Sequence, residues 1–123
     1  MATRILVVDD SSAIRRAFRL LIEQRPGWIV CGEADNGQTA IEKFRELSPD
    51  LVVMDLSMPV MNGLEAARTI SHIDPAVPMV MCTLFRSEQL EVEAHKAGVG
   101  RVLSKGEGLG TKLVDTIDRM LHS

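Results

Sequence analysis

The 123-residue sequence has little of several features that mark particular classes of protein. It contains only two cysteines, Cys31 and Cys82, which lie within apolar runs and lack the spacing of metal ligands. We expect both to be reduced residues of the core, since free cysteine is commonly buried and cytosolic disulfides are rare. No apolar run approaches the ~18 residues of a membrane span, and the N-terminal run is too short for a signal peptide. These absences predict a cytoplasmic protein without membrane contact.

An excess of basic residues is missing as well. The chain has 14 basic and 17 acidic residues, for a formal net charge of −3. Because proteins that bind nucleic acid directly usually carry a basic face, we expect no direct nucleic-acid binding. The apolar share of 46% and the charged share of 25% are ordinary for a folded protein. No repeat, linker or change in composition divides the chain, so residues 1–123 are expected to form one domain.

Short apolar runs alternate with helical patterns along the whole sequence. The five runs expected as strands cover residues 5–8, 28–31, 51–54, 79–82 and 101–104. Helices are expected from residue 11 or 12 to Pro26, from 37 to 48, from 64 to about 73, from about 87 to 97, and over a final segment that includes 113–121. This alternation predicts an α/β fold, a parallel sheet with five helices on its two faces. Right-handed crossovers favour the doubly wound strand order 2-1-3-4-5.

The first expected helix separates apolar from basic residues. The apolar positions expected to face the sheet are Ile14, Ala17, Phe18 and Leu21. The basic strip on another face consists of Arg15, Arg16 and Arg19. Such a strip is most often simply solvated, and the functional alternative is a docking surface for a partner.

Acidic, hydroxyl and basic residues follow four of the expected strands. Asp9 and Asp10 come after the first strand, Asp55 after the third, Thr83 after the fourth and Lys105 after the fifth. Each residue alone has a simpler interpretation as a turn, a helix cap or a solvated charge. However, the carboxyl ends of parallel strands share one edge, and these four strands are neighbours in the expected order. We therefore expect the five side chains to converge.

The chemistry of this group of residues is specific. Three crowded carboxylates repel one another and favour a hard cation such as Mg²⁺, which can also offset the charge of a phosphoryl oxygen. An aspartate can accept a phosphoryl group covalently, while a lysine and a hydroxyl bind further phosphoryl oxygens. The residues therefore predict a site that forms an aspartyl phosphate.

At this point the sequence resembles a known family, the receiver domains of bacterial two-component response regulators. The resemblance spans the chain, implies the flavodoxin-like, CheY-like version of the doubly wound fold, and is carried by Asp9, Asp10, residues 55–63, Thr83 and Lys105. It implies that Asp55 accepts a phosphoryl group from a sensor histidine kinase or a phosphotransfer protein. It further implies that Lys105 binds this group and that Thr83 moves toward it as a switch. The implied Mg²⁺ ligands are Asp9, Asp10, Asp55 and the backbone carbonyl of Ser57.

Three positions depart from the pattern of this family. Gly106 replaces the proline that usually follows the lysine, and Val102 replaces a tyrosine or phenylalanine that moves with the threonine. Leu84 stands where alanine or glycine is usual beside the phosphoryl site, and a larger side chain there could restrict access to Asp55. We expect phosphorylation to survive these changes, with altered rate or signalling.

Two other functions compete with the receiver interpretation. A phosphatase of the dehalogenase-like group would use Asp55 as a transient nucleophile, but it needs a second acid where this chain has Ser57. A receiver-like module that works without phosphate is the other alternative. For the receiver, the resemblance implies a partner or output domain that reads the face built by the fourth helix, fifth strand and fifth helix. The chain could be a complete receiver or the first domain of a longer regulator, such as a transcription factor.

Overall fold

The computed structural model describes residues 2–122 and contains a parallel sheet of five strands. The strands are β1 (Thr3–Val8), β2 (Trp28–Ala34), β3 (Leu51–Asp55), β4 (Met79–Thr83) and β5 (Arg101–Ser104). The helices are α1 (Ser12–Glu23), α2 (Gly37–Leu47), α3 (Gly63–Ile73), α4 (Glu88–Lys96) and α5 (Leu109–Leu121). The strand order is β2-β1-β3-β4-β5, which confirms the predicted doubly wound α/β fold.

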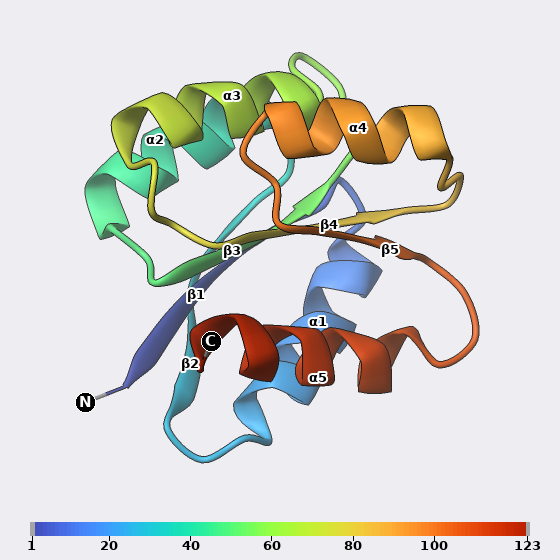
Figure 1. Ribbon diagram of the computed structural model, residues 1–123. Helices are drawn as coiled ribbons and strands as arrows, with labels where there is room; N and C mark the ends of the chain where they lie inside the picture. Colours follow the sequence, from blue (N-terminus) through green and yellow to red (C-terminus); the bar gives the residue numbers. More distant parts are fainter. Residues whose placement is uncertain (1, 123) are drawn as a thin grey trace.

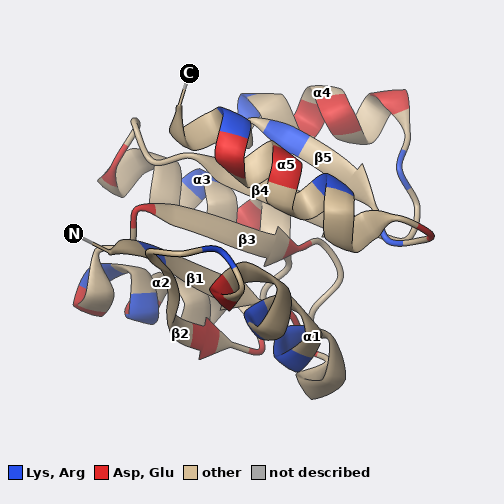
Figure 2. Cartoon of the chain, turned by 90° about the horizontal axis from the view of Figure 1, so that it is seen from below, with Lys and Arg blue, Asp and Glu red and all other residues tan. Residues whose placement is uncertain are grey.

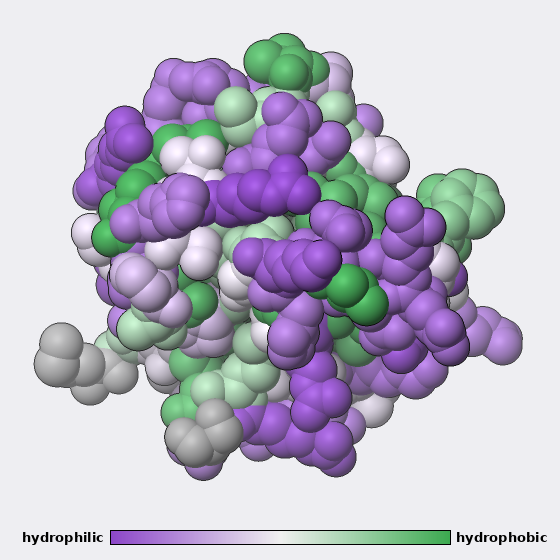
Figure 3. Space-filling view, turned by 45° about the horizontal axis from the view of Figure 1, so that its top comes forward, coloured by the Kyte–Doolittle hydropathy of each residue, from purple (hydrophilic) through white to green (hydrophobic). Residues whose placement is uncertain are grey.

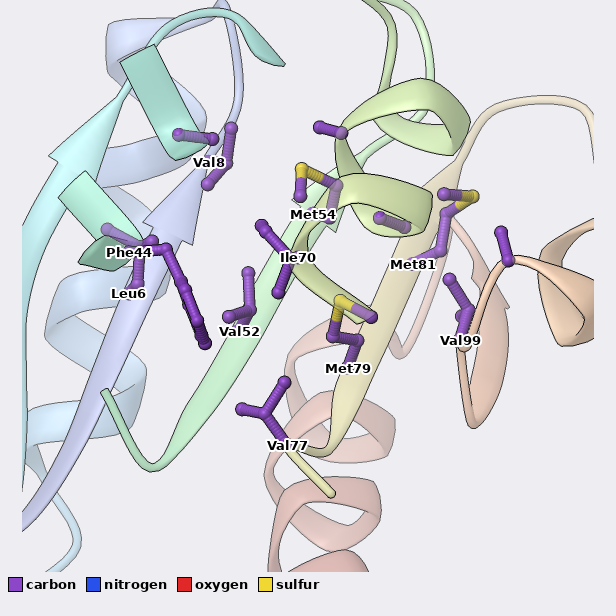
Figure 4. Close-up of a cluster of buried hydrophobic side chains, with 14 of the residues drawn as sticks. Leu6, Val8, Phe44, Val52, Met54, Ile70, Val77, Met79, Met81 and Val99 are labelled. Carbon is purple, nitrogen blue, oxygen red and sulfur yellow. The ribbon is translucent and has the colours of Figure 1, made fainter. Parts of the chain in front are cut away.

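The helices form a layer on each side of the sheet. Figure 1 shows α2, α3 and α4 over one face and α1 with α5 over the other. Because successive side chains of a strand point to opposite faces, β1 contributes Leu6 and Val8 to one hydrophobic cluster and Ile5 and Val7 to the other. Figure 4 shows the first of these clusters, between the sheet and α2 and α3. Every residue of the central strand β3 is buried.

The second strand is longer than its apolar run predicted. It continues from Cys31 through Gly32 and Glu33 to Ala34, and these last three residues pair with the end of β1 after a shift in register between Ile5 and Leu6. A glycine and a charged residue interrupt the apolar pattern that identifies a strand, so the sequence alone predicted an early end. The extension carries Glu33 to the side of α1, where it pairs with two arginines.

The helices begin where capping residues allow it. The hydroxyl of Ser11 accepts a hydrogen bond from the backbone N–H of Ile14. Of the two predicted candidates, Ser11 and Ser12, Ser11 is therefore the cap of α1. Asn36, Asn62 and Ser87 cap α2, α3 and α4 in the same way. The predicted apolar face of α1 was wrong at Ala17, which is exposed, and it omitted Ile22, which is fully buried. The buried stripe follows positions 14, 18 and 22, which lie one above another on a helix.

Both cysteines are free thiols, as predicted. Cys82 is fully buried on β4, and burial raises the pKa of its thiol to about 12, so the thiol stays protonated. Cys31 is only half-buried on the edge strand β2, so its assignment to the core was wrong. Across residues 2–122, no helix is both long and apolar enough to cross a membrane.

Candidate functional site

The carboxyl ends of β1, β3, β4 and β5 lie side by side and bring the predicted residues together. Asp55 and Thr83 are the last residues of β3 and β4, while Asp9 directly follows β1 and Lys105 directly follows β5. The backbone N–H of Lys105 donates to the carbonyl of Thr83 at 2.7 Å, which joins the ends of β4 and β5. Figure 2 shows the acidic end of β3 at this edge.

Three carboxylates form an acidic cluster at this edge. Asp9, Asp10 and Asp55 each offer an oxygen, and these oxygens lie within 4.8 Å of one another. Asp9 and Asp55 are 1% and 5% exposed, whereas Asp10 is exposed to solvent. One oxygen of Asp9 accepts the backbone N–H of Ser11 at 2.9 Å, so the cap residue of α1 also fixes this carboxylate. The all-oxygen set, open on the Asp10 side, suits a hard divalent cation.

Lys105 provides the positive charge of the site. Its Nζ lies 2.6 Å from Oδ2 of Asp9 and 3.1 Å from Oδ1 of Asp55, and the side chain is 11% exposed. Burial opposes the charge of Lys105, but the hydrogen bonds to Asp9 and Asp55 outweigh burial and raise the pKa of the ammonium group. Lys105 therefore stays charged and links two carboxylates that would otherwise be buried without a cation.

The charge of Asp55 is nevertheless disfavoured by its surroundings. Burial raises the pKa of Asp55, and the negative charge of Asp9 adds to this effect, while the hydrogen bond from Lys105 offsets only part of it. A bound cation would relieve this repulsion. The electrostatics of the cluster thus fit the addition of a divalent metal ion.

The loop after β3 brings the first residue of α3 close to the backbone of Asp55. The N–H of Gly63 donates to the carbonyl of Leu56 at 2.8 Å, so the loop closes directly behind Asp55. A Cβ at position 63 would overlap the backbone carbonyl oxygen of Asp55, and only glycine fits this approach. Ser57 is exposed within the same loop, two residues beyond Asp55.

We expect Gly63→Ala to lower the free energy of unfolding by about 3 kcal/mol, because the new methyl group forces the loop away from Asp55. Gly106→Ala is the matched control, since nothing lies within 4 Å of a Cβ built there. Urea unfolding followed by circular dichroism measures both. Equal stability of the two variants would contradict the close approach at Gly63.

Thr83 is buried, and the two residues that follow it in the chain are exposed and hydrophobic. Its side chain is 3% exposed, and its hydroxyl accepts the backbone N–H of Phe85 at 3.3 Å. Leu84 is 67% exposed and Phe85 83%, so both side chains face solvent beside the site. Figure 3 shows hydrophobic side chains at several places among the polar residues of one face of the molecule. Val102, which stands where the resemblance implies an aromatic residue, is 8% exposed and packs within the core.

The basic strip of α1 contains a contact that the sequence did not reveal. Arg15 donates to the backbone carbonyl of Asp9 at 2.7 Å and forms an ion pair with Glu33. Arg19 also pairs with Glu33, and of these three arginines only Arg16 is exposed. The interpretation of the strip as a merely solvated face was therefore wrong for Arg15 and Arg19. The one available signal was the position of Arg15 on the first turns of the helix that follows the acidic pair.

The doubly wound sheet with an acidic cluster and a lysine at one edge defines a class, the α/β domains whose carboxylate site lies at the carboxyl ends of the strands. The family model described as the response regulator receiver domain matches residues 5–118. The chain belongs to this family of response regulator receiver domains. Its similarity to signalling proteins of the same family confirms the predicted resemblance.

Individual relatives give the same result. The chain is 42% identical to the chemotaxis protein CheY of Thermotoga maritima over 98 residues, which cover 80% of this chain and 81% of that protein. It is 44% identical to a protein-glutamate methylesterase/protein-glutamine glutaminase of Methanosarcina acetivorans, a match that covers 98% of this chain but only 36% of that protein. The crystal structure of the response regulator domain of Thermotoga maritima CheB superimposes with a TM-score of 0.92 at 30% identity, covering 100% of this chain and 98% of that one.

Proposed function

We propose that this receiver accepts a phosphoryl group on Asp55 from the phosphohistidine of a sensor kinase or a phosphotransfer protein. The observation that carries this proposal is the position of Lys105, whose Nζ lies between the buried carboxylates of Asp9 and Asp55. This position supports the proposal because a nucleophile, a cation for phosphoryl oxygens and a metal-binding set of acids are what phosphoryl transfer to an aspartate requires.

The transfer follows from the chemistry of the residues. A carboxylate oxygen of Asp55 attacks phosphorus, an O–P bond forms, the P–N bond to the imidazole breaks, and the imidazole nitrogen keeps the electron pair and takes up a proton. Lys105 turns its ammonium group from Asp55 to a phosphoryl oxygen, and the hydroxyl of Thr83 donates to another. Asp9, Asp10 and Asp55, with the backbone carbonyl of Ser57, would hold Mg²⁺, whose charge offsets that of the phosphoryl oxygens.

The phosphorylated state would then be read elsewhere on the molecule. In this proposal a partner or output domain contacts the face built by α4, β5 and α5, and the domain works in the cytoplasm without binding nucleic acid or membrane itself. The chain acts as a signalling domain that assists only its own phosphorylation and dephosphorylation. A phosphatase is disfavoured because Ser57 occupies the position of the second acid that protonates a leaving group.

Incubation of the purified protein with acetyl phosphate and Mg²⁺ tests the proposal. We expect at most one phosphoryl group per chain, in an acyl phosphate that hydroxylamine removes. Multiple turnover of an ordinary phosphomonoester would overturn the proposal in favour of the phosphatase. The absence of any adduct in folded, Mg²⁺-saturated protein would overturn it in favour of a phosphate-independent module.

The switching role assigned to Thr83 gives a separate prediction. Thr83→Ala removes the acceptor of the Phe85 N–H, so we expect a loss of about 1 kcal/mol of stability and a weakened response at Phe85. The amide resonance of Phe85, followed by NMR before and after phosphorylation, should shift in the wild type and in Thr83→Ser, which keeps the hydroxyl. An equal shift of the Phe85 resonance in Thr83→Ala would show that the Thr83 hydroxyl does not link phosphorylation to Phe85.

A further inference from the structure

Four hydrogen bonds fix the position of Asp9. Its backbone N–H donates to the carbonyl of Ala34 at 3.0 Å, and its two carboxylate oxygens accept the Ser11 N–H at 2.9 Å and the Lys105 ammonium at 2.6 Å. The fourth contact is to the backbone carbonyl of Asp9, which accepts Nη1 of Arg15 at 2.7 Å. This contact is the only one of the four made by a side chain of α1, and the proposed chemistry above does not use it.

Arg15 is itself oriented by an ion pair with the edge strand. Its Nε lies 2.8 Å from one oxygen of Glu33, and the two side chains are 19% and 31% exposed. The other oxygen of Glu33 accepts two hydrogen bonds from Arg19, at 2.8 and 3.1 Å. The hydrogen bond from Arg19 outweighs burial and, together with that from Arg15, lowers the pKa of Glu33, so the carboxylate stays ionised at neutral pH. Glu33 therefore fixes the plane of the Arg15 guanidinium while leaving Nη1 for Asp9.

We infer that Arg15, oriented by Glu33, is a positioning residue for the Mg²⁺ site assigned above. The carbonyl it holds belongs to the planar peptide group that joins Asp9 to Asp10, so fixing this oxygen fixes the direction in which both carboxylates leave the backbone. Asp10 depends most on this support, since it is the exposed member of the cluster. The inference rests on the proposed function, because it presumes that the cluster binds Mg²⁺.

The direction in which the Mg²⁺ affinity changes on removal of Arg15 distinguishes a positioning role from simple charge repulsion. Arg15 carries a positive charge near a site for a cation, so a bystander arginine weakens Mg²⁺ binding by repulsion, and its removal should tighten binding. A positioning arginine has the opposite effect, because its removal lets the peptide group rotate and costs affinity. Residues that orient metal ligands typically contribute about tenfold or more to metal affinity.

Isothermal titration of the full chain with MgCl₂ tests the inference. Trp28 lies at the opposite end of the strands, so calorimetry is preferred to its fluorescence. We expect Arg15→Met to raise the dissociation constant about tenfold. Arg19→Met is the matched control: it removes the same charge from the same helix and also breaks contacts with Glu33, but it leaves the Asp9 carbonyl bound. We expect its dissociation constant to stay within about twofold of the wild type.

Arg15→Lys provides a second variant that keeps the charge and the fold. Its single ammonium group cannot hold Asp9 and Glu33 in the same geometry, so we expect an intermediate loss of affinity with an unchanged melting temperature. Tighter or unchanged binding in Arg15→Met, or an equal loss in Arg19→Met, would overturn the inference and leave the proposed function intact. A wild type that does not bind Mg²⁺ would overturn both.

Discussion

Asp55→Asn is expected to lose the phosphoryl adduct, with a rate of phosphorylation lower by on the order of 10³-fold or more, because the carboxamide is not a competent nucleophile. Asparagine has nearly the same shape and can still accept a hydrogen bond from Lys105, so the surroundings of the site should be retained. Phosphorylation by acetyl phosphate in the presence of Mg²⁺, followed by intact-protein mass spectrometry, measures the loss.

Two further substitutions serve as controls. Asp35→Asn, at an exposed acid beyond the end of β2, should leave the rate unchanged. Asp10→Asn should slow the reaction but allow the adduct to form at high Mg²⁺ concentration, because Asp10 belongs to the metal-binding set only. An adduct of wild-type yield on Asp55→Asn would assign the chemistry to another residue.

Asp55→Asn should not destabilise the fold at neutral pH. The pKa of Asp55 in the folded protein lies above its ordinary value of 3.8, mainly because of burial. A group whose pKa is raised by folding stabilises the protein below its unfolded pKa, and this contribution disappears as the pH rises through the folded pKa. The charged form of Asp55 is therefore unfavourable at neutral pH, and removing its charge should leave the unfolding free energy equal or higher.

Lys105→Met is expected to have the largest effect on stability, a loss of about 3–5 kcal/mol at neutral pH. The substitution leaves two nearly inaccessible carboxylates, Asp9 and Asp55, without the cation that lies within 3.1 Å of both. Lys112→Met is the matched control, because Lys112 is an exposed lysine on α5. Urea denaturation of the two variants gives the difference.

The loss of stability in Lys105→Met should become smaller as the pH falls. Lys105 lowers the pKa of Asp55 in the wild type, so without it the pKa of Asp55 rises further above 3.8. The carboxyl is then protonated more readily in the folded state, which relieves the buried charge as the pH falls. We expect a smaller destabilisation at about pH 5 than at about pH 7.5, and partial recovery on addition of Mg²⁺. A loss that is constant between these pH values would contradict the assignment of the effect to buried carboxylates.

The sequence was sufficient to predict the residues of the acidic edge, since they depend on strong local signals. The apolar run from Leu51 to Met54 forms a fully buried strand, and parallel strands must align their carboxyl ends. The convergence of Asp9, Asp55 and Lys105 therefore followed once the strand order was chosen. The roles of these residues in phosphoryl transfer remain predictions.

Features that depend on pairing between distant segments were not predictable in this way. The extension of β2 through Gly32 and Glu33 arises from a register shift against β1, which no local pattern encodes. The contact from Arg15 to the carbonyl of Asp9 requires both the phase of α1 and the place of Glu33 on the extended strand. The exposure of Ala17 has the same origin, because a shift of one position in helix phase exchanges neighbours between the buried and solvated faces.

The most direct test of the central proposal is the identification of the modified residue in the wild-type protein. After phosphorylation with acetyl phosphate and Mg²⁺, the acyl phosphate is trapped by borohydride reduction and the chain is digested for peptide sequencing by mass spectrometry. The proposal predicts that the modification lies on Asp55 alone. Modification of Asp9 or Asp10, or of a residue away from the acidic cluster, would contradict it.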